Sequence, residues 1–359
     1  MKKILFYINT LSGGGAERAI SNTASYFAEH GWNVILLTSF RTENEYSYSD
    51  KICRMSIEDE QVIQSLLRRN LSRIKAIRRI CKTEQVDVVV SFMREPNFRA
   101  LLATVGLRTK TVVSVRVDPN FEYKGVIGRI VGKLLLPHAD GAVFQTADAK
   151  AWFCKKLQRK ATVIYNIVDS KFFAMDYVGG NDIVAIGRIS PQKNQKLLIQ
   201  AFKKVHDKLP NERLLIYGRI EQDMGLNQQI KQLGLNDSVF FLGQRNNIPE
   251  ILSKAKLFVL SSDYEGMPNA LMEAMAVGVP SISTDCPCGG PRELFGEELS
   301  DMLVPVGDVD ALADKMIELL LDDERRIEIG RKMMARAGAF RADEIGEEWI
   351  EYVSSVCGE

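Results

Sequence analysis

Two glutamates separated by seven residues, Glu265 and Glu273, lie in the part of the chain that says most about chemistry. An apolar run at 257–260 predicts a strand, and residues 269–277 predict a helix that ends at a Gly-x-Pro break. The loop between them is formed by Gly266, Met267, Pro268 and Asn269. Its N–H groups and the positive end of the helix dipole form an anion site. Carboxylates beside such a site are suited to bind hydroxyls next to a phosphate, which predicts a nucleotide-sugar.

Chance is the alternative explanation for this pair, because glutamates are common in helices. The turn before the helix and the small residues along it argue against chance. Ala270, Ala274 and Ala276 leave one side of the helix small, so that it can approach a sheet or a ligand closely. We therefore expect a binding site here.

Two cations, Arg188 and Lys193, lie between an expected strand at 182–186 and a helix expected from about Asn194. Positive charge at a helix N-terminus opposes the dipole, so a structural role is unfavourable unless an anion lies between the two side chains. The alternative is a pair of solvated surface cations. We predict that both bind an anion.

Glycines follow several expected strands, at the edge where parallel sheets bind ligands. Gly13, Gly14 and Gly15 follow a strand at 4–8, and three suggest close approach to a ligand where a plain turn needs one or two. They do not form a G-x-G-x-x-G fingerprint, and no acidic residue ends the second strand, so a nicotinamide cofactor is disfavoured. In the second half, Gly187, Gly218 and Gly243 end strands in the same way.

Arg116 and Asp118 follow an expected strand at 111–115. A guanidinium stays protonated, so Arg116 cannot act as a general base. It is suited to stabilise a phosphate or the acceptor substrate of a group transfer. Asp118 either orients an acceptor hydroxyl or caps a turn before Pro119.

Together these segments resemble glycosyltransferase family 4. The segment EGMPNALMEAMAVGVPSISTD resembles the E-x7-E signature of that family, and SGGGAER, GRISPQKN, FVLSSDYEG and DCPCGGPREL match in order over nearly the whole chain. Two positions depart from the pattern. Arg116 stands where many relatives have histidine, and Arg219-Ile220 stands where Asp-Gly is common, which leaves the donor contacts there open.

This resemblance implies an α/β protein of GT-B fold, with two facing Rossmann-like, doubly wound parallel-sheet domains and an interdomain cleft. It implies a retaining hexosyltransferase-type enzyme that uses a nucleotide-sugar, UDP-linked, and a saccharide acceptor on a polyprenyl diphosphate, in polysaccharide or glycoconjugate synthesis. Arg188 and Lys193 would hold the donor diphosphate, without a metal or other cofactor. The alternatives are a nucleotide-sugar epimerase or hydrolase of the same fold and a non-catalytic nucleotide-sugar-binding subunit. The donor sugar cannot be named from the sequence.

Strands alternate with helices twice along the 359 residues, which predicts two parallel-sheet domains. The pattern restarts after 177–181, so we expect domains at 1–176 and 177–341. The last helix, within 342–359, resembles the GT-B segment that returns to the first domain.

Charge divides unequally between the two halves, although the net charge is +1. Residues 1–180 hold 27 Lys/Arg and 17 Asp/Glu, a balance of +10. The tract 66–82 has seven basic and no acidic residues, and Leu67, Leu71, Ile74 and Cys81 share a helical face. This predicts contact with an anionic membrane. Nucleic-acid binding is not predicted, because the basic residues are not interleaved with aromatic residues that could stack on bases. The alternative is an ordinary helix packed by its apolar side.

Scattered cysteines and the lack of a long apolar run favour a cytoplasmic protein. The basic tract 66–82 and the lipid-linked acceptor predict that it is peripheral on the inner face of the cell membrane. Cys286 and Cys288 have no second ligand pair at metal-binding spacing, so no metal site is predicted.

Overall fold

The computed structural model describes residues 2–58, 65–222 and 224–358. By internal contacts it divides into two compact units, Met1–Ile167 with Ala342–Glu359, and Val168–Arg341. The second unit begins before residue 177, where we expected the boundary. The N–H of Val168 donates to the carbonyl oxygen of Phe340 (3.0 Å), which joins it to the end of this unit.

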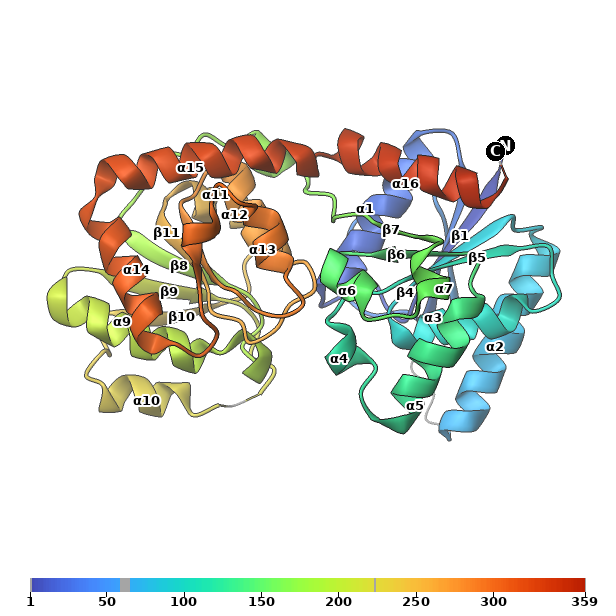
Figure 1. The fold of residues 1–359 in the computed structure, drawn as a ribbon, viewed down its shortest axis with the longest axis horizontal. Helices are drawn as coiled ribbons and strands as arrows, with labels where there is room; N and C mark the ends of the chain where they lie inside the picture. Colours follow the sequence, from blue (N-terminus) through green and yellow to red (C-terminus); the bar gives the residue numbers. More distant parts are fainter. Residues whose placement is uncertain (1, 59–64, 223, 359) are drawn as a thin grey trace. The chain divides into compact units, whose positions relative to one another are not determined.

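The first unit is built on a parallel sheet (Figure 1). The order of its strands is β3-β2-β1-β4-β5-β6-β7. Its strands are β1 (Lys3–Ile8), β2 (Asn33–Phe40), β3 (Cys53–Glu58), β4 (Val88–Phe92), β5 (Lys110–Ser114), β6 (Gly141–Phe144) and β7 (Ala161–Val163). Its helices are α1 (Gly15–Glu29), α2 (Leu66–Thr83), α3 (Arg94–Thr104), α4 (Pro119–Glu122), α5 (Gly125–Ile130), α6 (Ala147–Ala151), α7 (Lys155–Gln158) and α16 (Ala342–Val356), with turns η1 (Val131–Leu135) and η2 (Leu136–His138). The sequence did not predict β3 and β7, because these edge strands contain no fully buried residue to form an apolar run.

The second unit has a parallel sheet with the order β10-β9-β8-β11-β12-β13. Its strands are β8 (Asp182–Ile186), β9 (Arg213–Tyr217), β10 (Val239–Gly243), β11 (Ala255–Leu260), β12 (Ser281–Thr284) and β13 (Leu303–Val304). Its helical segments are α8 (Ser170–Phe173), α9 (Gln195–Lys208), α10 (Leu226–Gln232), α11 (Ile248–Ser253), α12 (Asn269–Val277), α13 (Gly290–Phe295), α14 (Val309–Leu321), α15 (Asp323–Ala337), η3 (Pro191–Lys193), η4 (Ser300–Met302) and η5 (Gly338–Phe340). Two parallel sheets confirm the predicted doubly wound α/β class.

Strand β1 shows why both faces of the first sheet are covered. Its side chains alternate between two cores. Ile4, Phe6 and Ile8 pack with residues of α1 and α16, whereas Leu5 and Tyr7 pack with residues of α2 and α3. A strand buried on both faces reads as a continuous apolar run, and this is the signal that located it in the sequence.

Helix α16 packs on α1 in the first unit (Figure 1). Trp349 is fully buried and stacks on Phe92 with 5.8 Å between ring centroids. Gly346 allows this approach, because a Cβ at that position would lie 2.3 Å from the ring of Tyr26. The Tyr352 hydroxyl accepts from the N–H of Ala142 (2.7 Å) at the start of β6. The C-terminal helix is thus part of the first core.

Each sheet has one point at which the strand order reverses. In the first unit it lies between β1 and β4, and in the second between β8 and β11. Ligands of doubly wound sheets bind outside the carboxyl ends of the strands at such a switch point. The loops that follow these four strands are therefore the places to search for a site.

Helix α2 packs on the core along its C-terminal part only. Its buried residues are Arg73, Ile77 and Cys81, while Leu67 and Leu71 are exposed. The buried residues of the helix begin at Arg73, and the leucines of its first two turns lie outside the core, so the packed-helix alternative does not hold for them. Arg73 differs from the other basic residues of the tract, because it is buried and forms an ion pair with Glu58 at 2.8 Å.

None of the helices in the described residues has the length and apolar character of a membrane-spanning segment. Helix α2, with 18 residues, is close to the length of a membrane-spanning helix, but it carries seven basic residues.

Candidate active site

Two loops of the second unit meet at the switch point between β8 and β11. Ser261 follows β11, and its hydroxyl donates to the carbonyl oxygen of Lys193 (2.9 Å). The N–H of Asp263 donates to the carbonyl oxygen of Gln192 (2.9 Å), and the Asn194 amide donates to the Asp263 carboxylate (2.7 Å). Asn194 also caps α9 by accepting from the N–H of Leu197 (3.1 Å). These hydrogen bonds hold the two loops as one rigid structure.

Lys193 and Glu265 form a buried ion pair across these loops. The Lys193 Nζ lies 2.6 Å from Glu265 Oε1, and both side chains are largely shielded from solvent. The same oxygen accepts from the Ser262 hydroxyl at 2.6 Å. A carboxylate held by an ammonium and a hydroxyl keeps a fixed position, and among the described residues its other oxygen has a single long contact, 3.5 Å from the Gln192 amide. Glu265 is therefore presented in a fixed orientation.

Arg188 reaches a second carboxylate in the same region. Its guanidinium pairs with Glu221 at 3.0 Å and donates to the Gln192 side-chain oxygen at 3.4 Å. Gln192 donates in turn to the carbonyl oxygen of Tyr264 at 2.9 Å. We expected an anion between Arg188 and Lys193, and the structure supplies protein carboxylates, Glu221 and Glu265. Two carboxylates of the protein therefore compensate the two cations at this helix start, without a bound anion.

Two of the predicted donor-site glycines are explained by loop packing. A Cβ on Gly218 would lie 1.8 Å from the carbonyl oxygen of Gly187, so the ends of β8 and β9 approach each other directly. The next residues pair as well, with the N–H of Ile189 donating to the Arg219 carbonyl oxygen at 2.9 Å. Arg219-Ile220 thus extends the pairing of the loops. Gly243 has a φ of +69° and accepts the Gly218 N–H at 3.0 Å.

Helix α12 begins at Asn269, where it was predicted, and carries Glu273. Glu273 is buried, as are Gly266, Met267 and Pro268 in the loop that leads into the helix. That loop packs against the start of α13, because a Cβ on Gly290 would lie 1.9 Å from the Gly266 carbonyl oxygen. The N–H of Glu265 donates to the carbonyl oxygen of Pro287 (3.0 Å) from the same segment. Both glutamates therefore lie on backbone fixed by its neighbours.

Burial also changes the thiol nearby. Desolvation, with the Glu265 charge as the next cause, raises the pKa of Cys286 well above its usual value. The thiol stays protonated and acts as an apolar neighbour of the ion pair. Among the described residues there is no group of His, Cys, Asp and Glu arranged to hold a metal ion.

Arg116 occupies the carboxyl end of β5 in the first unit and differs from the cations above. It is buried, contacts the Ser114 hydroxyl (3.2 Å) and the Asn166 side chain, and lies over the ring of Phe92. No carboxylate lies within ion-pair distance of it in the part of the chain that the structure describes. Its buried Nε has no hydrogen-bond partner there. Burial lowers the pKa of Arg116 to about 9, so it remains a cation at neutral pH.

Asp118 caps the short helix α4, since Oδ1 accepts from the N–H of Asn120 at 2.8 Å. This is one of the two roles that the sequence left open. The other oxygen, Oδ2, is buried without a hydrogen-bond partner among the described residues, so it also retains the capacity to bind a hydroxyl.

The loop after β4 lies across the first switch point and contains a strained residue. Met93 has φ 79° and ψ 157°, a region that residues with a side chain rarely occupy. The next N–H, that of Arg94, donates to the Glu122 carboxylate at 2.7 Å. Burial of this carboxyl group raises the pKa of Glu122 to about 7. Strain held by such contacts is typical of functional sites.

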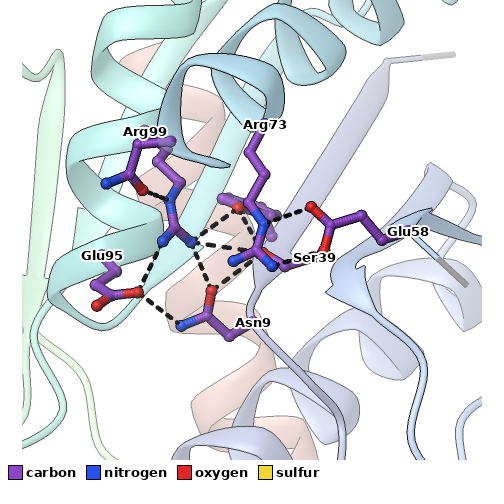
Figure 2. Close-up of polar contacts among 8 residues, drawn as sticks. Asn9, Ser39, Glu58, Arg73, Glu95 and Arg99 are labelled. Carbon is purple, nitrogen blue, oxygen red and sulfur yellow. Dashed lines mark hydrogen bonds and ion pairs between the residues drawn. The ribbon is translucent and has the colours of Figure 1, made fainter. Parts of the chain in front are cut away.

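A buried arginine, Arg99, ties the ends of β1 and β2 to helices α2 and α3 (Figure 2). Its guanidinium donates to Asn9 (2.6 Å), to Glu95 (2.7 Å) and to Asn70 (2.8 Å). Asn9 leads into the glycine loop, where Gly13 has a φ of +88° and Gly14 is the N-cap of α1, followed by its first residue, Gly15. Arg99 therefore fixes the strand end from which the glycine loop departs.

Sequence reasoning missed Gln192, Ser262 and Arg99. Gln192 and Ser262 lie within the matched motifs, beside Lys193 and three residues before Glu265, and this proximity was the available signal. Arg99 had none, because its partners are distributed over four elements.

Comparison with known proteins gives a consistent result. The family "Glycosyltransferase Family 4" matches residues 13–172, and "Glycosyl transferases group 1" matches residues 171–336. A Campylobacter jejuni enzyme named GalNAc-alpha-(1->4)-GalNAc-alpha-(1->3)-diNAcBac-PP-undecaprenol alpha-1,4-N-acetyl-D-galactosaminyltransferase is 28% identical over 99% of both chains.

Two further relatives extend the comparison. The N-acetylgalactosamine-N,N'-diacetylbacillosaminyl-diphospho-undecaprenol 4-alpha-N-acetylgalactosaminyltransferase of the same organism is 26% identical over 98% of this chain and 100% of its own. The crystal structure of Anabaena Alr3699/HepE in complex with UDP and glucose superposes with a TM-score of 0.81 at 21% identity, covering 99% of this chain and 100% of that one. The latter establishes a common fold.

Proposed function

Since the chain belongs to the family 4-like glycosyltransferases of GT-B fold, we propose that it transfers a sugar from a UDP-sugar to a lipid-linked saccharide with retention of configuration. The observation that carries the proposal is the rigid pair of loops at the second switch point. It brings Arg188, Lys193 and Glu265 together at the place where a doubly wound sheet binds a nucleotide.

The donor is assigned to the second unit. Glu273 accepts hydrogen bonds from the ribose hydroxyls, and the loop 266–269 with the positive end of α12 faces the diphosphate. Gly187, Gly218 and Gly243 line the donor site at the strand ends: Gly218 lets β9 approach β8 at Gly187, and Gly243 supplies a positive φ at the end of β10. Support for a uridine nucleotide comes from HepE, whose structure contains UDP and glucose.

Lys193 and Arg188 supply the positive charge for the leaving group. As the bond between C1 of the sugar and the diphosphate oxygen breaks, its electron pair stays on the phosphate, and two fixed cations stabilise that charge. Lys193 and Arg188 already pair with Glu265 and Glu221. The diphosphate therefore shares each cation with a protein carboxylate and does not meet two unpaired positive charges. No metal is required in this scheme.

The acceptor hydroxyl attacks C1 on the face that the diphosphate leaves, and its proton passes to a leaving phosphate oxygen. The new bond then has the configuration of the old one. Glu265 is fixed so that its second oxygen can bind a hydroxyl of the donor sugar. Asp118 Oδ2 orients the acceptor hydroxyl, and Arg116 offers an uncompensated charge to an acceptor phosphate.

A lipid-linked acceptor is supported by the two Campylobacter relatives, whose names specify undecaprenyl diphosphate substrates. We assign α2 to an anionic membrane surface, on the inner face of the cell membrane. Its exposed side chains include Arg68, Lys75 and Arg79. Arg78 is excluded, since it donates to the carbonyl oxygens of Ala103 and Val105 at the end of α3.

The test is a panel of labelled UDP-sugars incubated with the protein, with and without extracted membrane lipids, and read by mass spectrometry. Transfer that needs the lipid fraction is expected. Epimerised or hydrolysed donor in the absence of lipid would replace the proposal with an epimerase or a hydrolase. Donor binding without any product would identify a non-catalytic subunit.

A further inference from the structure

The segment from Lys124 to His138 presents four apolar side chains outward. It forms α5 and the turns η1 and η2. Val126, Ile127, Ile130 and Leu134 are 76%, 79%, 50% and 65% exposed, respectively. Their spacing of one, three and four residues places them on one side of a helix. This is the opposite of an ordinary amphipathic helix, in which such residues face the core.

Glycines form the inner side of this segment. A Cβ on Gly128 would lie 2.5 Å from the backbone of Tyr123, and one on Gly132 would lie 3.1 Å from the rings of Tyr123 and Trp152. Only glycine fits at Gly128 without displacing backbone. Rotating the helix to bury the isoleucines would therefore remove its close packing, and the outward orientation is built into the sequence.

Charge along the same surface is entirely positive. Lys124, Arg129 and Lys133 are exposed, and residues 123–139 contain no aspartate or glutamate. These three cations form no ion pair with a carboxylate among the described residues, although Lys133 lies over the ring of Trp152. Exposed branched apolar side chains interleaved with free cations match the interface of an anionic bilayer.

We propose that this surface, Lys124–Leu135, inserts its apolar side chains into an anionic membrane, next to which α2 provides further positive charge. Both α2 and η1 pack against α3 in the same unit. A second copy of the chain fits less well, because a symmetric contact would place these cations opposite their own copies. The proposal depends on the proposed function only in placing the acceptor in a membrane.

Vesicle flotation of the full-length protein provides the test, with phosphatidylglycerol-containing and phosphatidylcholine-only vesicles. We expect binding to the anionic vesicles only. The double variant Ile127→Gln, Ile130→Gln should reduce it by about tenfold or more, because each buried isoleucine contributes roughly that factor. The matched control is Leu321→Gln with Ile327→Gln, two exposed apolar residues of the second unit. It should bind as the parent does.

A second variant, Lys124→Gln, Arg129→Gln, Lys133→Gln, keeps the apolar residues and should lose binding at low salt. Unchanged binding of both variants would overturn the proposal. A dimer in vesicle-free solution that Ile127→Gln dissociates would assign the surface to a second copy instead. None of these measurements needs donor or acceptor, so failure of sugar transfer would leave the test valid.

Discussion

The two switch points of this protein treat positive charge in opposite ways. In the second unit, Lys193 and Arg188 each have a carboxylate, Glu265 and Glu221, and the loops that carry them are joined by hydrogen bonds. In the first unit, Arg116 is buried with no carboxylate within ion-pair distance among the described residues. A balanced pair is stable before a ligand arrives, whereas an unbalanced buried cation costs free energy until an anion compensates it.

This difference suggests a division of labour. In the proposed mechanism, the second unit is organised before the donor binds, and its paired cations stabilise the charge that develops on the donor diphosphate during the reaction. In the first unit, the free-energy cost of burying the Arg116 charge is offset only when an anion binds. The first unit also contains a third type of buried cation, Arg99, which is fully paired and serves the fold.

The largest effect on stability is expected from Arg99→Met. This change removes three charge-assisted hydrogen bonds, to Asn9, Asn70 and Glu95, each worth about 1.5–3 kcal/mol. Denaturant unfolding measures it, with Arg108→Met on the exposed surface as the control. A loss below about 1 kcal/mol would show that the network in Figure 2 does not hold the first switch point.

The largest effect on catalysis is expected from Lys193→Met. Loss of one cation that stabilises the leaving diphosphate should reduce kcat by about 10²–10³. Lys208→Met, which removes an exposed cation from the end of α9, serves as the control, and thermal unfolding checks that the unpaired Glu265 has not destabilised the unit. A folded variant with a rate within threefold of the parent would remove Lys193 from the mechanism.

Arg116→Met separates the two kinds of buried charge. No protein carboxylate is left unpaired by it, so the free energy of unfolding should stay level or rise, in contrast to Arg99→Met. Turnover of the lipid-linked acceptor should still fall by about tenfold or more, the factor for one charge-assisted contact. Destabilisation by more than about 2 kcal/mol would mean that Arg116 is a structural residue.

The smallest effect is expected from Glu273→Ala. Loss of hydrogen bonds to the ribose should weaken UDP binding by about 1–3 kcal/mol. Calorimetric titration with UDP measures this, and Glu265→Ala is the informative comparison because it should mainly reduce turnover. An unchanged UDP affinity for Glu273→Ala would remove the ribose assignment.

Much of this architecture could be predicted from the sequence, and the limits have physical causes. Central strands such as β1 and β8 read as apolar runs because they are buried on both faces, and α12 was located to the residue by its turn and its Gly-x-Pro break. The Lys193–Glu265 pair could not be read, because it joins residues 72 positions apart through the pairing of β8 with β11. Helix α2 shows a second limit, since periodicity gave its apolar face but not the point at which the core ends and Leu67 and Leu71 become exposed.

The central claim is that fixed side-chain cations, Lys193 and Arg188, take up the charge of the departing diphosphate. It is tested most directly by one sugar-transfer reaction run in excess EDTA, with the anomeric configuration of the product read by NMR. The account predicts full activity and a product with the configuration of the donor. A strict requirement for Mg²⁺ or Mn²⁺, or an inverted product, would contradict it.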